Sequence, residues 1–100
     1  MIETVLLVAV RDNQGRRFSP RLWDQLELRL AAFGGFTRAG DVVGQWASQG
    51  RTYADRSREY RVALTSWWQL ADWLAVVDWA RDAFRQEALY IKVAGIPEIR

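Results

Sequence analysis

The feature that most constrains the fold is an unbroken apolar run from Val5 to Val10, close to the start of the 100-residue sequence. A short and uniform run of this kind is typical of a β-strand that is buried on both faces and therefore central in a sheet. It is too short to cross a membrane as a helix. We therefore expect a central strand here, with the other elements arranged around it in a single domain, residues 1–100.

A first helix is predicted from Ser19 to the Gly34-Gly35 pair. The Ser19 hydroxyl can accept hydrogen bonds from the unpaired N–H groups at a helix start, and Pro20 suits the first helical position. Apolar residues then recur at helical spacing and form one stripe: Leu22, Trp23, Leu26, Leu30 and Phe33. Glycine readily adopts the left-handed backbone that often ends a helix, so Gly34 and Gly35 mark its end.

A second helix is predicted from Ser66 to about Gln86. Its first residues spell Ser-x-x-Gln, a pattern in which Ser66 and Gln69 satisfy each other's backbone N–H groups. At about 100° per residue, one arc of this helix is apolar. That arc contains Leu70, Trp73, Leu74, Val77, Ala80 and Phe84. We expect it to be the core face.

Three further strands are predicted, at residues 36–47, 52–65 and 88–94. The first contains Gly40 and Gly44, which indicate a bulge or a close backbone approach. The second alternates between apolar and polar residues in its second half, and a turn at Ser48–Arg51 joins the two. The order strand-helix-strand-strand-helix-strand predicts an α+β, ferredoxin-like βαββαβ fold. Such a fold has a four-stranded antiparallel sheet with two helices on one face.

The composition excludes several kinds of chemistry. The sequence has no cysteine and no histidine, so it lacks thiol nucleophiles, the usual general base near neutral pH and the commonest metal ligands. We therefore expect no metal and no cofactor. The net charge is +2, and a dispersed arginine excess of this size does not predict nucleic-acid binding. Glu3 stands where a signal peptide would be positive, so we expect a soluble, cytoplasmic protein without a membrane segment.

Four of the six tryptophans fall between Ser66 and Tyr90. The helical projection assigns Trp73 to the core, whereas four residues fall roughly opposite: Trp68, Val76, Trp79 and Ala83. Exposed aromatic clusters commonly mark contact surfaces. We expect these four residues to form a surface for self-association, as a homodimer or larger, or for a protein partner. In the alternative, Trp68 packs on a loop of its own chain and Trp79 lies along arginine or glutamine side chains.

Protein classes that share the predicted fold suggest where chemistry could occur. Acylphosphatases hold phosphate in a loop containing Gly and Arg after the first strand, and residues 13–18 form such a loop here. The asparagine that those enzymes need on the next strand is missing, so we expect a solvated loop. RNA-recognition domains place aromatic residues on the open sheet face, where this sequence has Asp55, Ser57 and Glu59.

A third class, the cofactor-free enzymes of the dimeric α/β-barrel type, works in a cavity over the open sheet face. If such a pocket forms here, its polar lining is predicted to come from Gln45, Ser57, Glu59, Arg61 and Glu87. A desolvated Glu87 carboxylate would have a raised pKa and would serve as a base. In the alternative, these strand-face charges are solvated or pair with each other.

The segments GGFT, GQW, DRSREYRV and FRQEALY resemble an uncharacterised family of small bacterial ferredoxin-like proteins, a domain of unknown function. The resemblance rests on Gly35-Phe36-Thr37, Gly44-Gln45-Trp46, Gly50, Ser57-Arg58, Val62, Phe84 and Gln86-Glu87-Ala88-Leu89. It implies the same fold and no particular activity. The tryptophan content of the second helix departs from the family pattern.

The leading hypothesis is a non-enzymatic binding or assembly module. It would form a homo-oligomer through its open sheet face or through the Trp68/Trp79 surface. The second hypothesis is a small-molecule-pocket protein or a cofactor-free enzyme of the dimeric α/β-barrel type. A closed cavity that contains Glu87 or Arg61 would favour the second hypothesis, whereas a flat apolar contact would favour the first.

Overall fold

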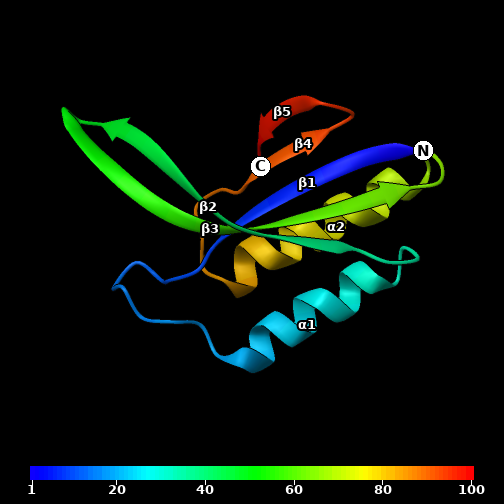
Figure 1. Cartoon of the computed structure of the whole chain (residues 1–100), viewed down its shortest axis with the longest axis horizontal. Coiled ribbons are helices and arrows are strands. Elements are labelled where there is room, and N and C mark those ends of the chain that lie inside the picture. The colour runs from blue at the N-terminus through cyan, green and yellow to red at the C-terminus, as the bar shows by residue number, and fades with distance from the viewer.

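The computed structural model describes the backbone of residues 1–100 and every side chain except those of Trp46 and Ser48. The elements are β1 (Ile2–Ala9), α1 (Pro20–Ala31), β2 (Thr37–Ser48), β3 (Arg51–Leu64), α2 (Gln69–Ala83), β4 (Tyr90–Val93) and β5 (Ile96–Ile99). The strands form one antiparallel sheet in the order β2-β3-β1-β4-β5. Both helices lie against one face, and the other face is open (Figure 1). The chain is therefore α+β, but the sheet has five strands where four were predicted.

β1 is the central strand, as its apolar run predicted, because it pairs with both β3 and β4. Alternate residues such as Leu6 and Val8 are buried beneath the helices. The residues between them, including Val5 and Leu7, face the open side and are half-buried. The expectation that β1 is buried on both faces is therefore wrong. Its apolar run has one face covered by helices and one face that the single chain leaves uncovered.

The core lies between the sheet and the two helices. Its helical part consists of Trp23, Leu26 and Leu30 from α1 and Trp73, Val77, Ala80 and Phe84 from α2 and its C-terminal cap. The predicted core arc of α2 is thus confirmed. Trp73 is fully buried, so truncating it removes about 3 kcal/mol or more of folding free energy. Within the residues described, neither helix has the length and apolar character needed to cross a membrane.

α1 begins and ends where the sequence predicts. The Ser19 hydroxyl accepts a hydrogen bond from the Leu22 N–H at 3.3 Å, and Pro20 is the first helical residue. After the helix, Gly34 and Gly35 have φ values of 101° and 142°, a backbone region that favours glycine. The local signals at both ends of this helix therefore determine its limits.

α2 is shorter than predicted, beginning at Gln69 instead of Ser66 and ending at Ala83. The Gln69 carboxamide reaches back to Thr65, whose N–H donates to Gln69 Oε1 at 2.7 Å. Trp68 occupies the N-cap position without a side-chain hydrogen bond. The prediction of a reciprocal cap between Ser66 and Gln69 is therefore wrong, because the Gln69 side chain bonds to Thr65 instead of Ser66.

β2 and β3 form a long hairpin that extends beyond the rest of the sheet. The turn predicted at Ser48–Arg51 is confirmed, and Gln49 and Gly50 have φ values of 51° and 75°. The predicted bulge is also confirmed, because the register shifts between Arg38 and Gly40. Bulges bend the strand that contains them. Figure 1 shows the hairpin curving away from the helices, toward the side of β4 and β5.

β5 is the strand that the sequence did not predict. A left-handed turn at Ala94-Gly95, with φ values of 52° and 81°, returns the chain along β4 and places Pro97 opposite Lys92. Proline is tolerated here because β5 is an edge strand. Arg100 then donates from Nε and Nη2 to the Asp78 carboxylate of α2 at 2.9 and 3.1 Å. These bonds hold the last strand in place.

Candidate functional site

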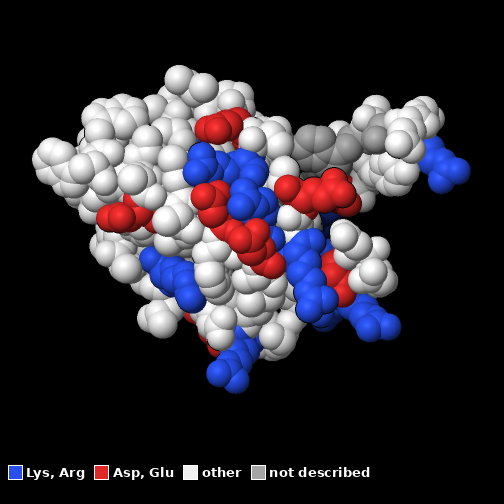
Figure 2. Space-filling model, turned by 180° about the vertical axis from the view of Figure 1, so that it is seen from behind, with Lys and Arg blue, Asp and Glu red and all other residues white. Residues whose placement is uncertain are grey.

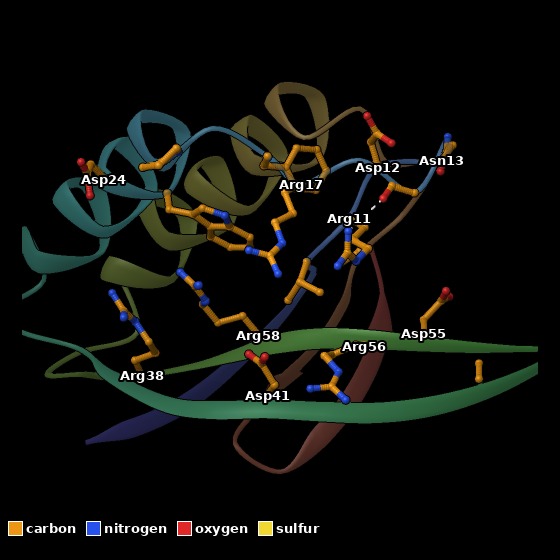
Figure 3. A pocket seen from close by; sticks show the side chains of 17 residues that line it. Arg11, Asp12, Asn13, Arg17, Asp24, Arg38, Asp41, Asp55, Arg56 and Arg58 are labelled. Carbon is orange, nitrogen blue, oxygen red and sulfur yellow. Dashed lines mark hydrogen bonds between the residues drawn. The ribbon is translucent and has the colours of Figure 1, made fainter.

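Two clefts flank the hairpin and share Ala9, Asn13 and Asp55 where they meet. The open-face cleft, of about 720 Å³, is on the sheet face that the helices leave uncovered. Its lining includes Leu7, Asn13, Tyr53, Asp55, Ser57, Gln86, Glu87, Tyr90 and Ile99. The arginine cleft, of about 980 Å³, is on the helix side, between the loop after β1, α1 and the hairpin (Figure 3).

The strand register determines which side chains line the open-face cleft. Ser57 of β3 is paired with a β1 residue, and Tyr90 of β4 is paired with Leu7 of β1, so these side chains share the open face. Tyr53 and Asp55 precede Ser57 at two-residue intervals and therefore point to the same side. Alternation along β3 thus places a phenol, a carboxylate and a hydroxyl in one row.

The loop after α2 supplies another wall of the open-face cleft. Arg85 has a left-handed φ of 54°, and the Gln86 N–H donates to the Arg81 carbonyl at 2.9 Å, which ends the helix. Gln86 Nε2 donates to the Phe84 carbonyl at 2.9 Å. Glu87 follows and lines the cleft, but it is exposed. A base at Glu87 was expected to be buried, but in the single chain this carboxylate is exposed.

The charges that line the open-face cleft have one sign. Asp55 and Glu87 are its two carboxylates, and its lining contains neither arginine nor lysine. Tyr53 and Tyr90 add two aromatic rings. Carboxylates and aromatic faces both attract organic cations, and aromatic faces also stack on flat rings. Among the side chains described, no group of three Asp or Glu residues is placed to hold a metal ion.

The structure separates the five residues predicted to line a pocket. Ser57 and Glu87 line the open-face cleft. Glu59 and Arg61 lie farther along β3 in a separate depression of about 380 Å³, with Arg61 Nε 2.6 Å from Glu59 Oε2. The register puts Gln45 on the helix side of β2, away from the other four. Ligand binding by these residues stays a prediction, and Ser57 and Glu87 are the two that share a cleft.

The residues predicted to form an interface differ in exposure. Trp68 is 84% exposed, and its neighbour Trp67 is 62% exposed. The other three are half-buried and pack against the core: Val76, Trp79 and Ala83. The Arg29 guanidinium of α1 lies 3.7 Å from the centroid of the Trp79 ring. Trp79 therefore lies against an arginine side chain of its own chain, which was the alternative considered for this indole. A role of these residues in association stays a prediction.

The arginine cleft was not predicted from the sequence. Its five arginines are Arg11 and Arg17 from the loop after β1, Arg38 from β2, and Arg56 and Arg58 from β3 (Figure 3). Arg56, Arg58 and the buried Tyr60 are spaced by two residues, a signal that both arginines face the helices. How the loop folds over them could not be inferred from that spacing.

Glu27 of α1 pairs with Arg38 and Arg58, two of the arginines that line the arginine cleft. It accepts hydrogen bonds from the Tyr60 hydroxyl and from Arg38 Nη2, both at 2.6 Å, and Arg58 Nη1 is 3.7 Å away. Burial alone would raise the pKa of Glu27, but the bonds from Tyr60 and Arg38 outweigh it and hold this pKa below the usual 4.5. Burial, together with the Glu27 carboxylate, raises the pKa of Tyr60 to about 12.

Charges of both signs are mixed on another face of the molecule. Figure 2 shows acidic and basic side chains alternating in a band, beside a large uncharged area. Ion pairs account for such mixing around α2, where Asp78 lies 3.3 Å from Arg81 and 2.9 Å from Arg100. The open-face cleft differs from this pattern because its charged lining is acidic, whereas the lining of the arginine cleft has five arginines and four aspartates.

Comparisons with known proteins bear on the fold alone. No protein-family model matches the sequence, and no curated protein matches it. The resemblance to an uncharacterised family therefore stays a prediction. A phage SAM lyase in complex with S-methyl-5'-thioadenosine superposes with a TM-score of 0.66 at 14% identity, covering 99% of this chain and 86% of that chain. A phage SAM lyase in the apo state gives 0.62, with the same identity and coverage.

Proposed function

We propose that this chain is an S-adenosylmethionine (SAM) lyase of the ferredoxin-like type, with an added fifth strand. Its open-face cleft would bind SAM and release S-methyl-5'-thioadenosine. The observation that carries the proposal is the lining of that cleft, which combines two carboxylates and two phenol rings with no basic side chain. The fold likeness to a phage SAM lyase, over 99% of this chain, supports the same assignment.

The charge of the substrate matches this lining. SAM carries a sulfonium, a positively charged sulfur with three carbon substituents, and the carboxylates of Asp55 and Glu87 would attract it. The adenine ring would stack on Tyr53 or Tyr90. Gln86 Nε2 is occupied by the Phe84 carbonyl, which leaves the amide oxygen to accept a hydrogen bond from the adenine amino group.

The reaction fits a chain without cysteine and histidine. S-methyl-5'-thioadenosine is what remains when the bond between the sulfonium sulfur and the aminobutyrate carbon breaks and its electron pair returns to sulfur. In the same step the carbon gains a bond to an oxygen nucleophile, or its neighbour passes a proton to a carboxylate or to water and an alkene forms. Because positive charge on sulfur disappears, surroundings less polar than water accelerate the step. Neither route requires a thiol or an imidazole.

The proposal is tested by calorimetric titration with SAM and with S-methyl-5'-thioadenosine, and by chromatography of SAM incubated with the protein. We expect both ligands to bind and SAM to be converted. Asp55→Asn and Glu87→Gln should weaken binding of cationic SAM by about 3- to 10-fold. They should change binding of the neutral thioether by less than about 2-fold, because only SAM carries the charge that they attract.

Asp41→Asn is the matched control, since Asp41 is an exposed carboxylate on the same hairpin that lines the arginine cleft instead. It should leave both affinities unchanged. Equal losses for SAM and for the thioether in the Asp55 and Glu87 variants would contradict the assigned site. Binding of SAM without its conversion would contradict the lyase activity.

Self-association is the second function that we propose. Trp67 and Trp68 are 62% and 84% exposed at the start of α2, and Tyr53 and Ile99 are 48% and 61% exposed at the open-face cleft. Such apolar side chains commonly mark contact surfaces. Sedimentation of the wild-type protein should show an oligomer, and Trp68→Ala should weaken it. A monomer at about 1 mM protein would contradict this proposal.

A further inference from the structure

We propose that the arginine cleft binds a small molecule that carries a phosphate group, such as a phosphate monoester or a diphosphate. This cleft shares Ala9, Asn13 and Asp55 with the open-face cleft, but none of its arginines lines that cleft, so the proposal does not rest on the SAM site. Guanidinium groups reach the arginine cleft from the loop after β1, from β2 and from β3. Figure 3 shows Arg17 of the loop and Arg58 of β3 pointing into the same space from its two sides.

Internal ion pairs neutralise only part of this positive charge. Glu27 is the acidic partner of two of the five arginines, because Arg38 is bound to it and Arg58 Nη1 lies 3.7 Å from it. One carboxylate is therefore shared between two guanidinium groups. A phosphate dianion in the cleft would supply the second charge that this arrangement lacks.

The remaining three arginines have no acidic partner among the described side chains. Arg11 donates to the Gly15 carbonyl at 3.0 Å, which is a neutral acceptor. Arg17 and Arg56 form neither a side-chain hydrogen bond nor an ion pair within the described part of the chain. Like charges gathered in one cleft repel each other, and a bound anion removes this repulsion.

Four aspartates also line the arginine cleft and lower its net positive charge. Asp12 accepts two backbone N–H bonds at 2.8 and 2.9 Å, so its carboxylate is used in folding the loop. Asp24 lies at the opposite end of the cleft from Asp12 in Figure 3. Asp41 and Asp55 are exposed on the hairpin. With five arginines against four aspartates, the net charge of the lining is low, which disfavours a long polyanion such as nucleic acid and favours a compact phosphate beside Arg17 and Arg58.

The Arg58 guanidinium is held before any ligand arrives. Arg58 stacks on the Trp23 ring, 4.1 Å from its centroid, and its Nη1 lies 3.4 Å from the Tyr60 hydroxyl. A β-bridge between Arg11 and Arg17 closes the loop that carries both residues. A planar guanidinium that is already oriented loses less entropy when it forms two parallel bonds to phosphate oxygens. β3 therefore presents one oriented guanidinium, opposite Arg17 of the loop.

The proposal is tested with inorganic pyrophosphate, titrated at low salt and followed by calorimetry and by the arginine Nε–Hε signals in NMR spectra. We expect saturable binding that shifts the Arg17 and Arg58 signals. Arg17→Gln should weaken the binding by about 10-fold or more, the usual effect of losing a charge-assisted hydrogen bond. Arg17→Lys should restore part of it, because a point charge replaces the planar fork.

Arg16→Gln is the matched control, because Arg16 is the exposed neighbour of Arg17 and does not line the cleft. It should change the affinity by less than about 2-fold. Arg56→Gln serves as a second variant on the rigid strand, and circular dichroism verifies the fold of each. The proposal is overturned if the Arg16 and Arg17 variants lose equal affinity. It is also overturned if pyrophosphate does not saturate by about 10 mM, or if single-stranded RNA binds more tightly than pyrophosphate.

Discussion

Replacing Tyr60 by phenylalanine should destabilise the fold by an amount that depends on pH. Tyr60 is 1% exposed, and its hydroxyl donates to Glu27 Oε2 at 2.6 Å. A hydrogen bond to a charged group contributes about 1.5–3 kcal/mol. Glu27 keeps its bonds from Arg38, and its side chain is 17% exposed, so water can hydrate the oxygen that the phenol leaves. We therefore expect the lower limit, a loss of about 1.5 kcal/mol near pH 7.

The sign of the pH dependence follows from the lowered pKa of Glu27. A carboxylate whose folded pKa is lowered stabilises the protein above its unfolded pKa, and this stability is lost as the pH falls through the folded pKa. Once Glu27 is protonated, its bond from Tyr60 is between neutral groups and contributes about 0.5–1 kcal/mol. The effect of Tyr60→Phe should therefore fall by about half between pH 7 and a pH below the folded pKa of Glu27.

Urea unfolding at both pH values measures this difference, and carbon-13 NMR titration of the Glu27 carboxyl measures its pKa directly. In the variant, that pKa should move upward, toward 4.5. Tyr53→Phe, on the same strand but 48% exposed, is the control and should have little effect at either pH. A Tyr60→Phe penalty that is equal at neutral and acid pH, with an unchanged Glu27 titration, would refute the reasoning.

Three further changes test the fold. Gly40→Ala should lower the free energy of unfolding by about 1–2 kcal/mol, because φ is 107° at the bulge, even though nothing lies within 4 Å of the added Cβ. Chemical unfolding measures this loss, and a loss near zero would mean that the bulge relaxes. Trp73→Ala should lower the free energy of unfolding by about 3 kcal/mol or more, whereas Trp68→Ala should lower that of the monomer by less than about 0.5 kcal/mol. Similar thermal shifts for the two variants would contradict the assignment of Trp73 to the core and Trp68 to the surface. Gln69→Ala should cost about 1 kcal/mol of unfolding free energy by removing the acceptor for Thr65, whereas Gln49→Ala at the exposed hairpin turn should not.

The sequence contains enough local information to predict most of the elements. Ser19, Pro20 and the glycine pair fix α1 because helix ends depend on neighbouring backbone groups. The two-residue alternation of Tyr60, Val62 and Leu64 identifies the buried face of β3 in the same way. β5 was missed because Pro97 argues against a strand unless the segment is known to be at an edge. Whether residues 96–99 lie at an edge depends on the order of the strands in the whole sheet.

The candidate sites were less predictable than the fold. Ser57 and Glu87 are 30 positions apart in the sequence, and only the strand register and the loop after α2 bring them to one cleft. Gln45 was grouped with them, but its place on the strand turns it to the other side of the hairpin. The arginine cleft depends on how the loop after β1 folds over β3. Contacts between distant segments decide such placements, and no local pattern encodes them.

The two edge strands of the sheet, β2 and β5, differ in how readily a strand of another chain could pair with them. β5 at one border has four residues, contains a proline and is tied to α2 by Arg100. β2 at the other border has twelve residues and pairs with β3 on one side only. The bulge at Gly40 interrupts its outer row of backbone groups near the base and leaves the distal stretch continuous. In a concentrated solution, misassembly by strand addition should therefore begin along the outer half of the hairpin.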